Sequence, residues 1–151
     1  MASLAAAMLR RPVEFEISIH NVDKQPLSVS EIRTRLVQFE TRDVVWLTRA
    51  DTFVKKTGLF PQATFVVGVD TIQRVPDVAY YQGNRGDRDQ AIEQLVGQGC
   101  RFLVFGRESE GTFIELNDCA LPARLAQVCQ GVSQASFRRD VSSRALRKGR
   151  P

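Results

Sequence analysis

Two adjacent serines and an arginine near the end of the chain have the spacing of a phosphate-binding site. Ser142 and Ser143 stand at the predicted start of a basic helix, where backbone N–H groups lack partners within the helix and attract anions. Arg147 follows about one turn later and can reach the same phosphate. A capped, solvated terminal helix would show the same pattern, so these residues alone leave both interpretations open.

A second group of candidates follows the most apolar predicted strand, residues 63–67. Gly68 would let a ligand approach the backbone, and Asp70 would accept hydrogen bonds from ribose hydroxyls. Asp70 would equally serve as a cap for the helix that follows. Lys24, after the first predicted strand, would point into the same crevice as a partner for phosphate, although a solvated lysine in a turn is the commoner case.

Other kinds of chemistry lack a pattern in this sequence. The phosphate loops GxxxxGK[ST] and GxGxxG do not occur between a strand and a helix. His20 is the single histidine and has no Ser/Asp or Cys partner pattern, so no catalytic residue is assigned. Three cysteines without CxxC spacing indicate reduced thiols in a cytoplasmic protein and no metal site.

Strands and helices alternate along the chain and must position these candidates. Strands are predicted at residues 13–19, 44–47, 63–67 and 101–105, with a short edge strand at 112–116 and a last strand at 137–141. Helices are predicted at residues 1–11, from Ser28 or Ser30, at 51–58 with Gly58 as its stop, at 87–96 closed by Gly97 and Gly99, at 122–130, and from Ser142. Residues 80–87 and 107–110 are predicted to be loops.

This order predicts a single α/β domain over residues 1–151, with a mainly parallel sheet and helices on both faces. Ligands of such sheets bind outside the carboxyl ends of the strands. The candidate segments are therefore residues 21–24, 68–71 and 106–107.

The net charge of +4 is unevenly distributed along the chain. Residues 138–151 hold six of the 21 basic side chains and one acid, so the rest of the chain is close to neutral. Without aromatic interleaving or a further basic face, this distribution does not favour nucleic-acid binding. The apolar run at the start is shorter than the roughly 20 residues that span a bilayer, so no membrane partner is predicted.

Five segments, taken in their order and spacing, carry a resemblance that runs from about residue 4 to residue 150. They are residues 15–24 (FEISIHNVDK), 47–50 (LTRA), 65–70 (FVVGVD), 100–107 (CRFLVFGR) and 137–143 (FRRDVSS) with Arg147. Together they resemble the cytidylyltransferase-like family, which is related to the nicotinamide mononucleotide adenylyltransferases.

The resemblance implies a Rossmann-like nucleotidylyltransferase fold that binds a nucleoside triphosphate with Mg²⁺ and transfers a nucleotidyl group to a phosphate-bearing acceptor. Residues 141–147 are similar to the closing motif ISSTxxR, in which the helix start and the arginine hold the triphosphate, with Arg144 in place of the threonine. Gly68 and Asp70 match the GxD motif, which implies a nucleoside contact. Lys24 stands where relatives tend to carry a lysine that faces phosphate.

The chain departs from the family at its amino-terminal side. Members open with a strand and an HxGH motif, and a chain with one histidine cannot contain that motif. Residues 4–11 resemble the end of the helix that should follow it, so we expect an N-terminally truncated domain. In the family's sheet order the absent strand lies between the strands at residues 13–19 and 63–67. The tyrosines at 80 and 81 replace an acceptor-binding tryptophan, so the acceptor is not specified.

These features predict a truncated nucleotidylyltransferase-like protein that binds a nucleoside triphosphate and transfers its nucleotidyl group weakly or not at all. The alternative is a non-enzymatic interaction protein that pairs through its open sheet. Its partner would donate a strand or be a second copy of the chain.

Overall fold

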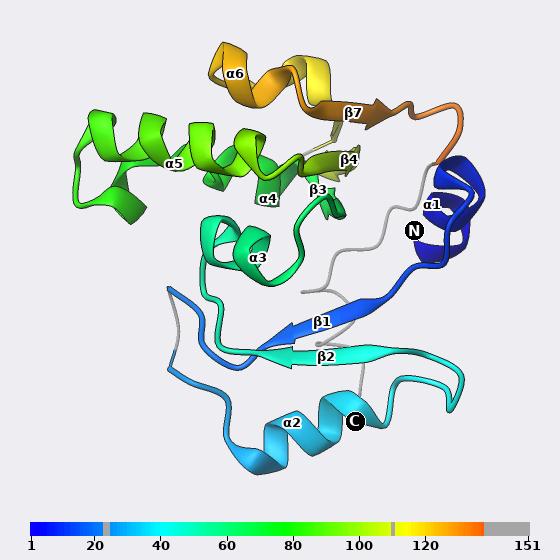
Figure 1. Cartoon of the computed structure of the whole chain (residues 1–151). Coiled ribbons are helices and arrows are strands. Elements are labelled where there is room, and N and C mark those ends of the chain that lie inside the picture. Colours follow the sequence, from blue (N-terminus) through cyan, green and yellow to red (C-terminus); the bar gives the residue numbers. More distant parts are fainter. Residues whose placement is uncertain (23–24, 110, 138–151) are drawn as a thin grey trace.

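Three parallel strands form the centre of the structure, a computed structural model of the chain (Figure 1). They are β3 (Thr64–Gly68), β4 (Arg101–Phe105) and β7 (Cys129–Val132), paired in the order β3-β4-β7. The structure describes residues 1–22, 25–109 and 111–137.

Two further strand pairs and a set of helices complete the described part. The strands are β1 (Phe15–Ser18), β2 (Val45–Thr48), β5 (Arg107–Ser109) and β6 (Thr112–Ile114). The helices are α1 (Ala2–Leu9), α2 (Val29–Leu36), α3 (Phe53–Leu59), α4 (Val69–Arg74), α5 (Arg85–Gly97) and α6 (Ala123–Ala126), with short 3-10 helices at Val78–Tyr81 and Leu116–Asp118. The protein is thus mixed α/β, and its sheets are built mainly from parallel strands.

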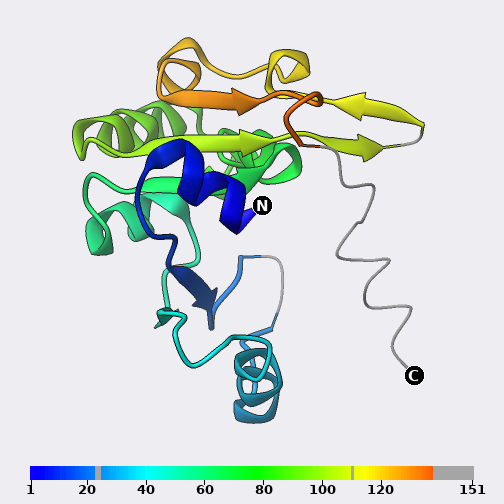
Figure 2. The same ribbon diagram turned by 90° about the vertical axis from the view of Figure 1, so that its right-hand side faces the viewer.

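The apolar run of β4 is explained by helices on both of its faces. Phe102 and Val104 pack with side chains of α4, α5 and α6, whereas Leu103 and Phe105 pack with Ala5 of α1. Successive side chains of a strand point to opposite faces, so a strand covered on both sides needs apolar residues throughout. Figure 2 shows α1 on its own side of this sheet, away from the long helix α5.

The helix ends follow the capping signals of the sequence. Ser28 caps α2 in a capping box, in which its backbone N–H donates to the Glu31 carboxylate over 2.8 Å. Asn84 caps α5, and Gly99 lies just beyond its end with φ +70°, in the left-handed region that favours glycine. The helices predicted from Ser28 and over residues 87–96 are therefore confirmed, with their ends moved by one or two residues.

β1 and β2 form a separate parallel pair (Figure 1). Figures 1 and 2 show this pair below the three-stranded sheet, with α2 beneath it. The ring of Phe15 on β1 packs against Phe39 with 4.9 Å between centroids, which ties the segment after α2 to the pair. Among the described residues no strand joins β1 to β3.

The structure corrects the prediction for β3. A continuous apolar strand is typical of burial on both faces, but only Val67 of β3 is buried. β3 is an edge strand of the three-stranded sheet, so its open side exposes side chains that a neighbouring strand would cover.

Two further predictions of local structure are wrong. The predicted helix at residues 122–130 is the short helix α6, and the residues after it form β7, where the Phe102 N–H donates to the Val128 carbonyl over 2.8 Å. Pairing with β4 overrides the local pattern there. Residues 107–109 were expected to be a loop but form β5, in an antiparallel hairpin with β6 that turns at Gly111 (φ +81°).

Smaller differences concern helix and strand ends. α3 continues past Gly58 to Leu59, so this glycine lies within the last turn and is not the stop. Most of the last predicted strand, at residues 137–141, and the basic helix from Ser142 lie outside the described residues. In the part of the chain that the structure describes, no helix has both the length and the apolar character to cross a membrane.

Candidate functional site

The carboxyl ends of β3, β4 and β7 lie together because the three strands are parallel and in register. Gly68 pairs with Phe105, and Phe105 pairs with Val132, so the residues that follow each strand leave the sheet at one edge. This edge is where open α/β sheets bind their ligands. It contains two of the three segments predicted from the sequence, residues 68–71 and 106–107.

Gly68 ends β3 and is also the N-cap residue of α4. Its backbone is extended (φ −89°), so glycine is not required there by a left-handed conformation. A Cβ at this position would meet nothing closer than the Phe105 carbonyl oxygen at 3.9 Å. The space beside Gly68 is thus open, as expected for a position where a ligand approaches the backbone.

Asp70 lies in the first turn of α4 and forms an ion pair with Arg107 of β5. The bond joins Arg107 Nη1 to Asp70 Oδ2 across the ends of two neighbouring strands. α4 has no side-chain cap, so the interpretation of Asp70 as a helix cap is wrong. A carboxylate in the first turn is nevertheless favoured by the helix dipole.

Both members of this pair are accessible to a ligand. The side chain of Arg107 is 38% exposed and that of Asp70 is 56% exposed. An ion pair this open adds little to stability, so its partners can exchange each other for a ligand at low cost. The sequence analysis placed Arg107 in a candidate segment after a buried strand and also in a predicted solvated loop, and it gave this residue no role of its own.

The remaining predicted site residues cannot be placed relative to this pair. Lys24, Ser142, Ser143 and Arg147 lie outside the described residues. The structure therefore brings together Gly68, Asp70 and Arg107, a residue that the sequence placed in a candidate segment without giving it a role.

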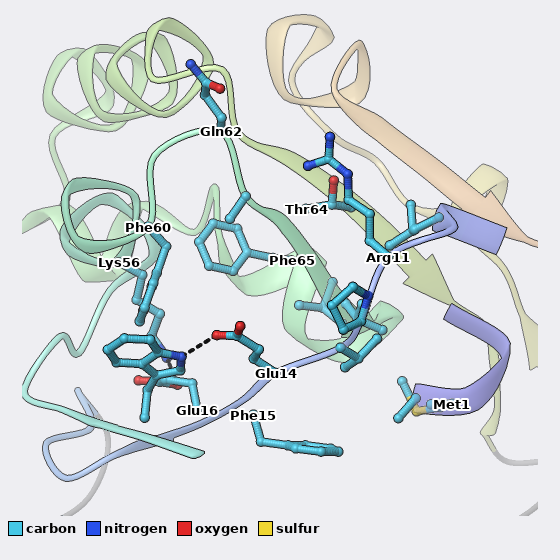
Figure 3. Close-up of a pocket in the computed structure, with 18 of the residues that line it drawn as sticks. Met1, Arg11, Glu14, Phe15, Glu16, Lys56, Phe60, Gln62, Thr64 and Phe65 are labelled. Atoms are coloured by element: carbon cyan, nitrogen blue, oxygen red, sulfur yellow. Dashed lines mark hydrogen bonds and ion pairs between the residues drawn. The ribbon is translucent and has the colours of Figure 1, made fainter. Parts of the chain in front are cut away.

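A cavity of about 590 Å³ lies between the β1–β2 pair and β3 (Figure 3). Figure 3 shows Phe60 and Phe65 on one side of it and Met1 and Arg11 on another. Its lining is mostly apolar. The lining residues belong to α1, to the segment between α1 and β1, and to β1, β2, α3 and β3. The open edges of β1 and β3 thus share one cavity.

Backbone hydrogen bonds show which groups of β3 face this cavity. Arg101 N–H donates to the Ala63 carbonyl over 2.9 Å, so alternate residues from Ala63 onward direct their backbone groups toward β4. The N–H and C=O groups of Thr64 and Val66 therefore point away from β4, to the open edge. By the same reasoning the backbone groups of Glu16 on β1 point away from β2.

Two carboxylates in the cavity wall have hydrogen-bonding partners. Lys56 Nζ lies 2.6 Å from Glu16 Oε2, and the other oxygen of that carboxylate accepts from the Thr48 hydroxyl. At the rim, Trp46 Nε1 donates to Glu14 Oε2 over 2.5 Å, the bond marked by the dashed line in Figure 3. The wall therefore combines apolar side chains with two carboxylates that are already hydrogen-bonded.

No metal centre is formed by the described residues: no three His, Cys, Asp or Glu side chains gather closely enough to hold an ion. The cysteines are also poor nucleophiles. Burial raises the pKa of the Cys100 and Cys119 thiols and raises that of Cys129 to about 11. The thiol, which these shifts favour, reacts far more slowly than the thiolate.

The raised pKa values predict slow alkylation of the native protein. At pH 8 about one Cys129 side chain in a thousand is ionised, whereas an exposed thiol is ionised to about a quarter. Peptide mass spectrometry after a short iodoacetamide pulse should find Cys129 largely unmodified in native protein and fully modified in urea. Equal labelling in both states would contradict the buried environment of this thiol.

Comparisons of the chain with protein-family models, with curated proteins and with solved structures find no match. The class that the observed features define is a mixed α/β protein with parallel sheets and a charged pair at the carboxyl edge.

Proposed function

We propose that the chain is a nucleotide-binding domain of the Rossmann-like nucleotidylyltransferase type, which binds a nucleoside triphosphate at the carboxyl edge of β3 and β4. The observation that supports this best is the placement of Gly68, Asp70 and Arg107 at the ends of two adjacent parallel strands. An open glycine, a carboxylate and a guanidinium are groups that suit the sugar and phosphates of a nucleotide.

The two charged side chains have separate roles in this proposal. Asp70 accepts hydrogen bonds from ribose hydroxyls, and Arg107 turns from Asp70 to a phosphate oxygen when the nucleotide binds. Lys24, Ser142, Ser143 and Arg147 are assigned to the triphosphate on the resemblance alone. A phosphate-bearing acceptor, whose identity is open, would bind beside the nucleotide.

Mg²⁺ would enter with the triphosphate. This ion usually binds through phosphates together with one or two carboxylates, and not in a cage made by the protein alone. The phosphates supply most of its ligands, so the ion requires no cluster of protein carboxylates at the site. The ion would neutralise the polyphosphate, while the protein groups hold and orient the nucleotide.

Nucleotidyl transfer by this chain is expected to be weak or absent. Transfer to phosphate depends on positioning and on stabilisation of the charge that develops on the transferring group. The chain has one histidine, so it cannot supply the paired imidazoles of related enzymes. Binding without appreciable turnover is therefore the activity to test first.

Isothermal titration with ATP and with CTP in the presence of Mg²⁺ tests the proposal. Asp70→Ala and Arg147→Ala should each lower the affinity about tenfold, because each removes a charge-assisted hydrogen bond to the ligand. Arg124→Ala is the matched control, since it breaks another exposed ion pair, with Glu93, away from the site. No binding at millimolar nucleotide, or an equal loss in the control, would refute the site.

A further inference from the structure

We propose that the cavity between β1 and β3 is a binding site for a short, extended, apolar polypeptide segment of a partner protein. The segment pairs through its main chain with the open edge of β3. This inference is independent of nucleotide binding, which concerns the carboxyl edge of the sheet. It rests on the backbone groups, the volume and the lining of the cavity.

The backbone groups at the cavity favour a polypeptide as the ligand. The backbone N–H and C=O groups of Thr64 and Val66 point to the open edge of β3. Those of Glu16 point to the open edge of β1. Donors and acceptors that alternate at the spacing of a strand are matched by another strand, whereas a compact small molecule reaches only part of the row. Main-chain pairing also removes the cost of leaving these groups unpaired.

The volume of the cavity fits a single short strand. A strand spaced about 4.8 Å from its neighbours in a layer about 10 Å thick, with a rise of about 3.3 Å, occupies about 160 Å³ per residue. A cavity of about 590 Å³ therefore holds about four residues. β3, whose edge would be paired, is five residues long.

The lining of the cavity specifies apolar side chains on both faces of the segment. Val66, Leu9 and Val13 pack against one buried cluster on the side of α1, and Phe65 packs with Phe53 of α3 on the opposite side. A strand covered on both sides has a continuous apolar sequence. The Glu16 carboxylate in the wall is already paired with Lys56, so no charge in the segment is needed to match it.

The experiment uses the full chain and a capped hexapeptide, Lys-Val-Ile-Val-Val-Lys, whose terminal lysines keep it soluble. Trp46 is the single tryptophan and lies in the cavity wall, so binding should shift its emission. Amide exchange followed by NMR should slow at least tenfold at Thr64 and Val66. Phe65 and Val67, whose amides already pair with β4, should change much less.

Two controls distinguish binding through main-chain hydrogen bonds from binding through apolar contacts alone. Two further peptides carry N-methyl groups at alternate residues, one at the odd positions and the other at the even positions. At least one of them should bind at least tenfold more weakly than the unmethylated peptide. In the protein, Thr64→Pro removes one outward amide and should weaken binding about tenfold. Leu47→Pro makes the same change on the outer edge of β2, away from the cavity, and should leave binding unchanged.

Three outcomes would overturn the proposal. They are binding that leaves exchange at Thr64 and Val66 unaltered, binding of both methylated peptides as tight as that of the unmethylated peptide, and no shift of Trp46 emission at millimolar peptide. A fourth outcome concerns the free protein. If sedimentation velocity shows a dimer, and the Thr64 and Val66 amides are protected from exchange without peptide, the occupant is a second copy of the chain. That result would refute a separate partner.

Discussion

Replacing Gly106 by alanine is expected to lower the free energy of unfolding by about 1–3 kcal/mol and to weaken nucleotide binding. A Cβ on Gly106 would lie 2.5 Å from Phe113 Cε1 and 2.8 Å from the Ile114 carbonyl oxygen. The second contact is with backbone of β6, which cannot rotate away. The β5–β6 hairpin must therefore move, and it would take Arg107 away from Asp70.

Urea denaturation followed by circular dichroism measures the first effect, and titration with ATP and Mg²⁺ measures the second. Gly97→Ala is the matched control, because a Cβ at Gly97 meets nothing within 4 Å and the residue lies in α5. That substitution should raise the free energy of unfolding by about 0.5–1 kcal/mol. If both alanine variants were equally stable, the close approach of the hairpin to Gly106 would be disproved.

Phe102→Ala should produce the larger loss of stability, about 3–5 kcal/mol. The Phe102 side chain is 1% exposed, and its ring lies 5.3 Å from that of Phe53 and 5.7 Å from that of Phe65. Removing it leaves a cavity where β4, β3 and α3 meet. The midpoint of urea unfolding should fall strongly. The matched control is Phe39→Ala, which removes a partly exposed ring.

The Phe39 variant tests whether the effect depends on burial. Phe39 packs against Phe15 near the surface, so its removal should cost less than half as much as removal of Phe102. Similar losses for both variants would mean that β4 is not the centre of the core.

Local signals predicted the elements that depend on local chemistry. The N-cap of α2, the glycine that follows α5 and the apolar run of β4 were recognised because each acts within a few residues of the chain. β7 was missed because Gln130 and Gly131 disfavour a strand, and its existence depends on pairing with β4.

The candidate site was predicted in part for the same reason. Gly68 ends β3 and Asp70 follows two residues later, so their place at the carboxyl edge follows from chain order. The approach of Arg107 to Asp70 depends on the direction in which the β5–β6 hairpin leaves β4, which Gly106 allows and no short pattern encodes. Figure 2 shows this hairpin extending beyond the end of the sheet.

In the described residues β1 and β3 are not joined by a strand, and the cavity between them depends on long-range packing. The resemblance placed the absent strand between the strands at residues 13–19 and 63–67, and in the structure β1 and β3 pair with other strands and line one cavity. The cavity's size and the pairing of Lys56 with Glu16 depend on how α1 and α3 pack, so they required coordinates.

The most direct test of nucleotide binding at the carboxyl edge is a series of ¹H–¹⁵N NMR spectra recorded while ATP and Mg²⁺ are added. The proposed function predicts that the largest shifts fall on the amides of Gly68 and Asp70 and on the side chain of Arg107, while Thr64 and Val66 stay unchanged. Shifts confined to Thr64 and Val66, or no shifts at millimolar nucleotide, would contradict it.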